Sequence, residues 1–310
     1  MVPANSRLAA SRPKQCPATN DGSSDKMRSA NGPPDDGYTM LQKTKPAAPR
    51  IPPHSADFEF DLDQLIRNRR SIRSFLPRPV PRALLDAALT IAQRAPSSSN
   101  VQPWRLVLAA GACRDRLSRA LRVAAERGPM SNILPPLPEV FQHHRQALGE
   151  LVYEAMGIAR DDHAARRQAL LRNYDFFGAP TVGIVCMPEA LGVADAVSVG
   201  MYLQTLVLSL SVRGLGTCAQ VALAGYPEII RGVLNIPSDL LIICGLAIGY
   251  ADPAFPANHL HIPRVPVTET VTFLEDLAVQ PGRTSPRHCS AGVPGLSESI
   301  KTWVLVGPPN

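Results

Sequence analysis

Four arginines and two serines lie within the eight residues from Arg67 to Ser74. So many like charges in one short segment are costly unless an anion neutralises them. Guanidinium groups suit a phosphate because their N–H donors meet its oxygens in a fixed geometry. Each charge-assisted bond contributes roughly 1.5–3 kcal/mol, so two or three could hold a mononucleotide at about micromolar affinity. The segment predicts a phosphate site, with a solvated basic turn as the alternative.

A second polar segment follows about 20 residues later, from Ala95 to Trp104. Its hydroxyls and amides lie between two prolines, after the end of an expected helix. A rigid loop of this kind can present neutral donors and acceptors to a flat heteroaromatic ring. A helix cap with a turn is the alternative interpretation.

The remaining residue types exclude several kinds of chemistry. Every lysine lies outside residues 56–280, so the body has neither the lysine of a pyridoxal phosphate enzyme nor that of a P-loop. The six cysteines are scattered, and His259 and His261 have no third ligand nearby in sequence, so no metal site is expected. The net charge of +6 comes from the two ends of the chain, so we expect no nucleic-acid-binding face.

Composition divides the chain into three parts. Residues 1–55 and 281–310 hold 14 of the 31 prolines and are rich in glycine and serine, which predicts a disordered N-terminal arm and a loose C-terminal tail. Residues 56–280 form a body of the size of one domain. The apolar stretch Ala196–Val212 is shorter than the ~20 residues of a membrane span, so we expect a buried helix and no membrane contact. The scattered cysteines are typical of a cytoplasmic protein.

Hydrophobic periodicity predicts a mixture of helices and strands without a strict βαβ repeat. This mixture favours the α+β class over a doubly wound parallel sheet. We expect helices over Asp61–Arg70, Arg82–Arg94, Cys113–Glu126, Asp195–Val212 and Pro227–Leu234, one or two helices over Val140–Asn173, and strands over Trp104–Ala109, Thr181–Met187, Leu240–Ile248 and Thr268–Phe273.

The glycine-rich segment Gly214–Ala219 fits the Gly-x-Gly-x-x-Gly/Ala dinucleotide fingerprint, and Asp239 follows at a suitable distance. That fingerprint requires a strand before it and a helix that starts within it. Here a helix-length run precedes the segment, and Pro227 delays the next helix. We therefore reject a Rossmann-type site.

Taken together, these segments resemble the FMN-dependent nitroreductase family. The resemblance covers roughly residues 58–275 and implies a three-layer α/β/α sandwich with a mixed, mostly antiparallel sheet, assembled as a homodimer with FMN at the subunit interface. The motifs that carry it, in family order, are Arg-Arg-Ser-x-Arg-x-Phe from Arg69, Ala-Pro-Ser-Ser-x-Asn-x-Gln-Pro-Trp from Ala95, Gly-Leu-Gly-Thr-Cys from Gly214, an apolar strand ending in Ile-Gly-Tyr at Tyr250, and Arg264.

The resemblance also implies which residues bind the cofactor. Many relatives have Glu-Gly where this chain has Val221-Ala222, so a carboxylate that serves nicotinamide or substrate is missing there. The implied contacts are Arg69, Arg70, Ser71 and Arg264 around the phosphate and ribityl chain, Arg73 near the pyrimidine edge of the ring, Pro96, Ser97, Ser98, Asn100 and Gln102 along the ring from the other subunit, and Gln220, Val221 and Ala222 near flavin N5.

The implied activity is that of an NAD(P)H oxidoreductase. NADH or NADPH would reduce FMN, and a nitroaromatic, quinone or related small acceptor would then take the electrons from flavin N5 in a ping-pong order. Because the cofactor performs the difficult step, no separate catalytic residue is assigned. The alternatives are a non-catalytic FMN-binding sensor or storage protein, and a flavin-destructase or dehalogenase-type branch of the same superfamily.

Two further segments lie between the helix expected over Cys113–Glu126 and the strand expected over Thr181–Met187. Residues 128–173 match no recognised motif, and in this family an insertion at such a place covers the active site and sets substrate choice. The aromatic cluster Tyr174–Phe177 precedes a Gly-Ala-Pro turn. We interpret it as core or dimer interface rather than as a substrate clamp.

Overall fold

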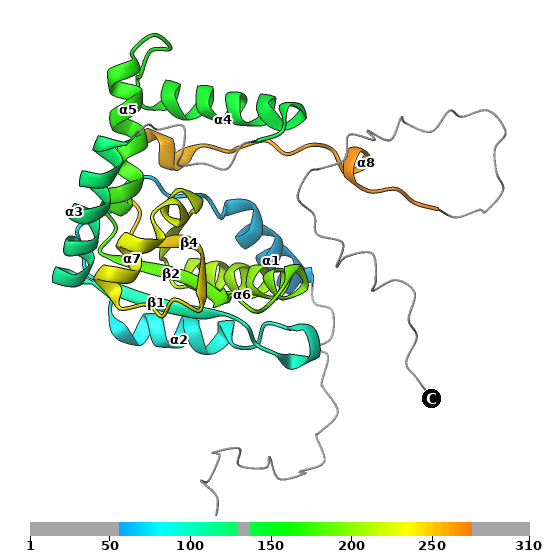
Figure 1. The fold of residues 1–310 in the computed structure, drawn as a ribbon. Coiled ribbons are helices and arrows are strands. Elements are labelled where there is room, and N and C mark those ends of the chain that lie inside the picture. Colours follow the sequence, from blue (N-terminus) through cyan, green and yellow to red (C-terminus); the bar gives the residue numbers. More distant parts are fainter. Residues whose placement is uncertain (1–55, 129–136, 275–310) are drawn as a thin grey trace, which may run out of the picture. The chain divides into compact units, whose positions relative to one another are not determined.

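A four-stranded sheet forms the centre of the structure, a computed structural model that describes residues 56–128 and 137–274 (Figure 1). The strand order is β1-β2-β4-β3, and each neighbouring pair is antiparallel. The predicted arm and tail lie outside the described residues. The strands are β1 (Arg105–Ala110), β2 (Thr181–Pro188), β3 (Gly216–Gln220) and β4 (Leu240–Gly249).

Helices cover both faces of this sheet, which is why the central strands β2 and β4 are apolar nearly throughout. One face packs against α3 (Gly111–Arg127), α7 (Pro227–Leu234) and the short turn η4 (Arg172–Gly178). The other face packs against α2 (Arg82–Ala92) and α6 (Val193–Val212). The result is the predicted three-layer α+β sandwich. Within the described ranges, the parallel pairing is one isolated bridge between Ser71 and Thr217.

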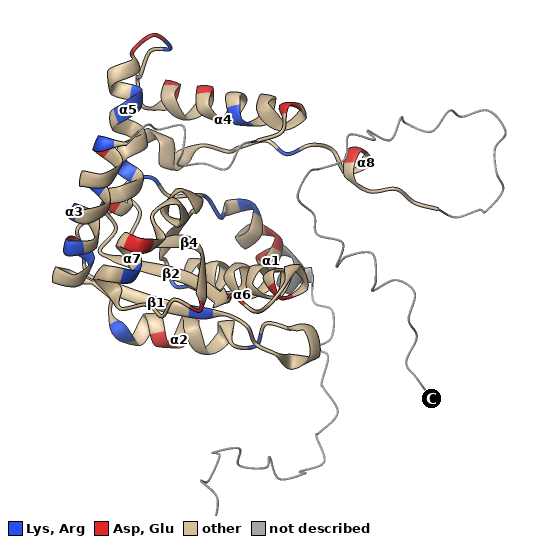
Figure 2. Cartoon of the chain, in the orientation of Figure 1, with Lys and Arg blue, Asp and Glu red and all other residues tan. Residues whose placement is uncertain are grey.

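The long apolar helix α6 begins where the Asp195 carboxylate accepts the N–H of Gly192 at 3.2 Å. Its inner face includes Tyr202, which stacks on Trp104 with ring centroids 4.9 Å apart. Asp195 is the one charged residue of the helix, which is therefore almost entirely tan in Figure 2. Among the described residues, α6 is the one helix long and apolar enough to cross a membrane by length and composition. One face of α6 packs in the protein core, and 39% of its apolar window is buried there.

The insertion folds as two helices, α4 (Gln142–Ala155) and α5 (His163–Leu171). The Asp162 carboxylate caps α5 by accepting the N–H of Ala165 at 2.8 Å. Helix α1 (Ala56–Asn68) precedes the arginine-rich segment. The single-turn 3₁₀ elements are η1 (Ser98–Asn100), η3 (Glu139–Phe141), η5 (Val221–Gly225) and η6 (Pro256–His259).

Two sequence-based assignments differ from the structure. The strand predicted over Thr268–Phe273 is wrong, because Val267–Thr270 forms the short helix α8 after Pro266 and the residues that follow belong to no strand of the described sheet. The segment ends in strand-like alternation, but none of the four strands in the described part of the chain pairs with it. The strand β3 is not among the predicted elements, because Gly216 and Ala219 have low strand propensity and pairing with the edge of β4 stabilises the strand.

Candidate functional site

The arginine-rich segment lies across the ends of β3 and β4. The N–H of Ile72 donates to the carbonyl of Thr217 at 2.9 Å, and the N–H of Leu76 donates to the carbonyl of Tyr250 at 2.9 Å. Gly216 allows this close docking, since a Cβ at that position would lie 2.7 Å from Cγ1 of Ile72. The absence of a side chain at one strand residue therefore sets how closely the arginines approach the sheet.

A cavity of about 900 Å³ opens beside the segment. It is lined by parts of α1, α4, α6 and the loop after η6, so it joins residues that are far apart in sequence. None of the described residues that line it is acidic. The structure brings five of the predicted cofactor residues together here, namely Arg69, Arg70, Ser71, Arg73 and Arg264, and adds Arg67, His144, Gln204 and His261.

Arg70 has a hydrogen-bond donor at the cavity that no described group satisfies. Its Nη2 lies 2.5 Å from Nε2 of His261. Its Nε is buried and has no hydrogen-bond partner among the described residues. A buried donor of this kind costs roughly 1–3 kcal/mol, which a negatively charged acceptor would remove. His261 is not among the predicted site residues, and its alternation with His259 is the one sequence signal that could draw attention to it.

The two histidines of that alternating pair have separate contacts. Nε2 of His259 lies 2.8 Å from the carbonyl oxygen of Pro253, whereas His261 contacts Arg70 at the cavity. The described part of the chain contains no group of three or more histidine, cysteine or acidic side chains that could hold a metal ion. The site is therefore built from arginines and neutral polar groups.

Local hydrogen bonds hold two further arginines at the cavity. Nη1 of Arg264 donates to the carbonyls of Ile262 and Pro263, at 2.9 and 3.1 Å. Nη1 of Arg73 donates to the carbonyl of Ser71 at 3.1 Å. These short-range bonds restrict where each guanidinium can point, which lowers the entropy lost when a ligand binds.

The backbone of Arg73 is held from both sides by residues that sequence reasoning missed. Its N–H donates to Oδ1 of Asn258 at 2.7 Å, and its carbonyl accepts from Nη2 of Arg172 at 2.9 Å. Asn258 is only 4% exposed, and its Nδ2 also donates to the carbonyls of Ser74 and Asp252. Burial lowers the pKa of the Arg172 guanidinium, and nearby carboxylates partly offset this effect. No local sequence motif indicates either residue, because both form hydrogen bonds with Arg73, about 100 or more positions away in the chain.

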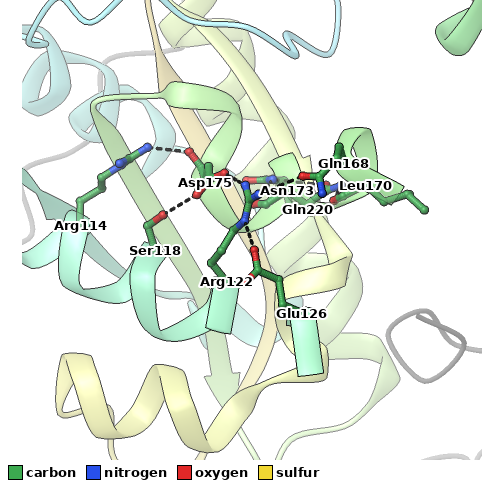
Figure 3. A network of polar contacts seen from close by, with 9 residues as sticks. All are labelled: Arg114, Ser118, Arg122, Glu126, Gln168, Leu170, Asn173, Asp175 and Gln220. Carbon is green, nitrogen blue, oxygen red and sulfur yellow. Dashed lines mark hydrogen bonds and ion pairs between the residues drawn. The ribbon is translucent and has the colours of Figure 1, made fainter. Parts of the chain in front are cut away.

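The predicted N5 residues form the end of β3 and the start of η5. Gln220 is 2% exposed, and its Nε2 donates to the carbonyl of Asn173 at 2.8 Å (Figure 3). Its Oε1 is buried without a hydrogen-bond partner in the described part of the chain. Val221 is exposed, whereas Ala222 is buried. None of the three lines the arginine cavity, and the side chain of Gln220 points toward η4.

The segment Pro96–Gln102 lies apart from the arginine cavity within one chain. The N–H of Ser98 donates to Oγ of Ser198 at 3.3 Å, and the N–H of Gln102 donates to Oγ of Ser97 at 3.1 Å. Gln102 lines a separate, shallow hollow with Trp104. Ser99, Asn100 and Gln102 have φ values between 47° and 56°, in the left-handed region. The assignment of this loop to the flavin of a partner subunit stays a prediction.

Cys218 of β3 lies close to the arginine segment. Burial raises the pKa of its thiol to about 11, and the charges of Arg73 and Arg69 oppose that effect. The thiol is therefore protonated at neutral pH and behaves as a small apolar side chain rather than as a nucleophile.

Helix α4 of the insertion borders the same cavity. His144, Ala147, Leu148 and Leu151 recur at helical spacing along the side of α4 that faces it. The cavity thus has an apolar wall with one imidazole opposite the arginines. This places part of the insertion at the arginine cavity, while its role in covering the active site and setting substrate choice stays a prediction.

Residues 66–250 match the model of the Nitroreductase family. The chain belongs to that family. It is 35% identical over 207 residues to a 4-nitrobenzoate reductase of Pseudomonas putida, covering 66% of this chain and 91% of that protein. It is 33% identical over 238 residues to nitroreductase NfnB of Mycolicibacterium smegmatis, covering 76% and 99%.

A solved structure shows the same fold as this nitroreductase. The crystal structure of the FMN-dependent nitroreductase NfnB from Mycobacterium smegmatis in complex with NADPH superposes with a TM-score of 0.65 at 33% identity. The match covers 70% of this chain and all of NfnB. The predicted family and fold are therefore confirmed.

Proposed function

We propose that this nitroreductase is an FMN-dependent NAD(P)H oxidoreductase that reduces nitroaromatic and related acceptors. The observation that carries the proposal is the cavity at which Arg69, Arg70, Arg73 and Arg264 meet without an acidic neighbour. The buried Nε of Arg70 lacks an acceptor among the described residues, and a phosphate matches both the charge and the fork of a guanidinium. The FMN and NADPH dependence of NfnB supports the same cofactor and the same class of electron donor.

The residues divide into three roles in this proposal. Arg69, Arg70, Ser71 and Arg264 hold the phosphate and ribityl chain. Arg73 offsets the negative charge that reduction leaves at the pyrimidine edge. The backbone near Val221 and Ala222 orients the reactive edge of the ring, while the loop Pro96–Gln102 of a partner subunit covers the ring.

Bound FMN supplies the hydride chemistry, accepting a hydride from NADH or NADPH and passing two electrons to the acceptor. Reduction of a nitro group to a nitroso group consumes one NAD(P)H and one proton and releases NAD(P)⁺ and water, so atoms and electrons balance. We propose a ping-pong order in which NAD(P)⁺ leaves before the acceptor binds. Quinones are a second acceptor class, because they take the same two electrons without loss of water.

The proposal includes a homodimer, and helix α6 supports it. Val193, Val197 and Met201 recur every four residues along its outer face and are 71%, 54% and 44% exposed. Gly200 on the same helix has nothing within 4 Å of where a Cβ would lie, so a second helix could approach closely. An uncharged apolar stripe with small residues is typical of a helix that packs against a second copy. Sedimentation of the wild type and of Val197→Glu tests this, since the variant should dissociate.

We place the enzyme in the cytoplasm, without membrane or nucleic-acid partners. The four cysteines of the described residues are free thiols, as expected in a reducing compartment. Free thiols in protein that is alkylated as the cells are lysed would agree with this location, and stable disulfides would contradict it.

The decisive experiment is an absorbance spectrum of the purified protein before and after anaerobic addition of NADH or NADPH. We expect a yellow protein that bleaches on addition and regains its colour rapidly when a nitroaromatic compound is mixed in. Parallel double-reciprocal plots would support the ping-pong order. A protein that bleaches but is reoxidised slowly by every acceptor would favour the sensor or storage alternative. A colourless protein that does not take up added FMN would refute the proposal.

A further inference from the structure

The turn η4 joins the insertion to strand β2 and has an unusual backbone. Phe176, Phe177 and Gly178 have φ values of 53°, 55° and 81°, so three consecutive residues lie in the left-handed region. Aromatic side chains rarely adopt this conformation, because Cβ then approaches the backbone carbonyl. Such a turn persists only where its surroundings hold it, and residues of this kind cluster at functional sites.

Helix α3 supplies the groups that hold the turn. Nε of Arg114 donates to the carbonyl of Ala179 at 3.0 Å, and its Nη2 donates to the carbonyl of Asp175 at 2.6 Å. A single guanidinium therefore brackets the three left-handed residues, and its carbon Cζ lies 5.3 Å from the ring centroid of Phe176. The two carbonyls are met by two different nitrogens of one rigid, planar guanidinium, a spacing that the single nitrogen of a lysine does not reproduce.

The Asp175 carboxylate makes a second set of contacts with α3, one and two helical turns beyond Arg114 (Figure 3). Its Oδ1 accepts from Oγ of Ser118 at 3.0 Å, and its Oδ2 accepts from Nη1 of Arg122. Nε of Arg122 donates in turn to Glu126 of the same helix at 2.9 Å. The side chains of Arg114, Ser118 and Arg122 thus form one polar face of α3 that fits the turn.

Held by α3 in this way, η4 contacts the arginine-rich segment, which is the first of the two proposed flavin-binding segments. Nη2 of Arg172 donates to the carbonyl of Arg73 at 2.9 Å. The carbonyl of Phe177 accepts the N–H of Phe75 at 3.2 Å. Two residues of the turn therefore hold the backbone on either side of Ser74, directly after the arginines of the cavity.

The same turn also contacts the second proposed segment, η5, through the residues directly before and after it. The carbonyl of Asn173 accepts from Nε2 of Gln220, which directly precedes η5. The ring of Tyr174 packs edge-on against Tyr226, which directly follows η5, with centroids 5.4 Å apart. One seven-residue turn thus bridges Arg73 and the Val221–Ala222 backbone, which lie about 150 residues apart in the chain.

We propose that Asp175 and Arg114 are positioning residues that lock η4 and thereby set the spacing between Arg73 and the Val221–Ala222 backbone. This inference rests on the proposed function, in which those two groups contact opposite edges of the flavin ring. Reduction adds negative charge to the ring, so the spacing affects reduced FMN more than oxidised FMN. By holding η4 in place, Asp175 and Arg114 then affect the reduction potential of FMN without contacting the cofactor.

The test uses the full chain and the variants Asp175→Asn and Arg114→Lys. Asparagine retains the shape of the aspartate but loses its charge, and lysine retains charge but cannot bridge both carbonyls. Glu126→Gln is the matched control, because it removes a partner of Arg122 that contacts neither η4 nor the cavity. For each protein we would measure dissociation constants of oxidised and reduced FMN, the midpoint potential and the melting temperature.

We expect both variants to weaken the binding of reduced FMN about tenfold more than that of oxidised FMN, which lowers a two-electron potential by about 30 mV. The control should keep the wild-type potential. A lowered melting temperature with an unchanged potential in Asp175→Asn would overturn the inference, since a merely structural residue affects both redox forms equally. If one variant does not fold, the other gives the same readout. Failure of the wild type to bind FMN would instead refute the proposed function.

Discussion

Replacing Arg70 with methionine should change stability and cofactor affinity in opposite directions. Nε of Arg70 is buried without a hydrogen-bond partner among the described residues, and Nη2 lies against His261 at 2.5 Å. Removing the unpartnered donor recovers roughly 1–3 kcal/mol, while losing the partly exposed contact with His261 costs about 0.5–1.5 kcal/mol. The flavin-free variant should therefore be about 1 kcal/mol more stable than the wild type.

The same substitution removes a guanidinium fork from the phosphate site. One bidentate charge-assisted contact contributes about 2–4 kcal/mol, so the dissociation constant of FMN should rise roughly 30-fold to 1,000-fold. Arg70 is thus a binding residue that lowers the stability of the folded protein as long as no ligand is bound.

The assay combines thermal melts of the flavin-free proteins with fluorescence titrations of FMN. A gain of about 1 kcal/mol corresponds to roughly 2–4 °C for a domain of this size. Arg82→Met is the matched control, because Arg82 forms an exposed ion pair with Asp86 on α2, away from the cavity. That pair contributes at most about 0.5 kcal/mol, so both readouts should stay near the wild type. A less stable Arg70→Met protein with unchanged FMN affinity would refute the reasoning.

Four further substitutions test other parts of the protein. Arg264→Ala should weaken FMN binding by about 2–4 kcal/mol, and an unchanged dissociation constant would remove Arg264 from the phosphate site. Gly216→Ala should destabilise the protein by about 1–3 kcal/mol and reduce FMN content, because the new Cβ would lie 2.7 Å from Cγ1 of Ile72. Gly232→Ala in α7, where nothing lies within 4 Å of the new Cβ, should instead stabilise the protein by up to about 1 kcal/mol in thermal melts of the flavin-free protein. Burial raises the pKa of Cys218 from an ordinary 9.0 to about 11, so its contribution to stability is present below pH 9.0 and is lost as pH rises toward 11. At pH 10 this loss is on the order of 1 kcal/mol, and Cys218→Ala should unfold with a correspondingly weaker dependence on pH between 8 and 10.

Local patterns along the chain predict most of the regular elements correctly. The helical spacing of Leu84, Leu85 and Leu89 marks α2, and continuous apolar runs mark β2 and β4. These signals are reliable because a helix or a buried strand must present apolar residues at its own period. The predictions fail where local pattern and long-range pairing disagree. The segment Thr268–Phe273 alternates but has no neighbouring strand in the described sheet, whereas β3 has weak propensity and a strong neighbour in β4.

The sequence by itself determined the chemical character of the site: an arginine cluster without lysine or metal ligands, followed by motifs in the order of the nitroreductase family. It did not determine which distant groups complete that site. Arg70 meets His261, Arg73 is held by Asn258 and Arg172, and a left-handed turn at Phe176 is stabilised by α3. Each of these contacts joins residues separated by about 60 to 190 positions, so their geometry depends on how the layers pack. Only the tertiary structure decided this geometry, because hydrogen bonds between residues so far apart produce no periodic pattern in the sequence.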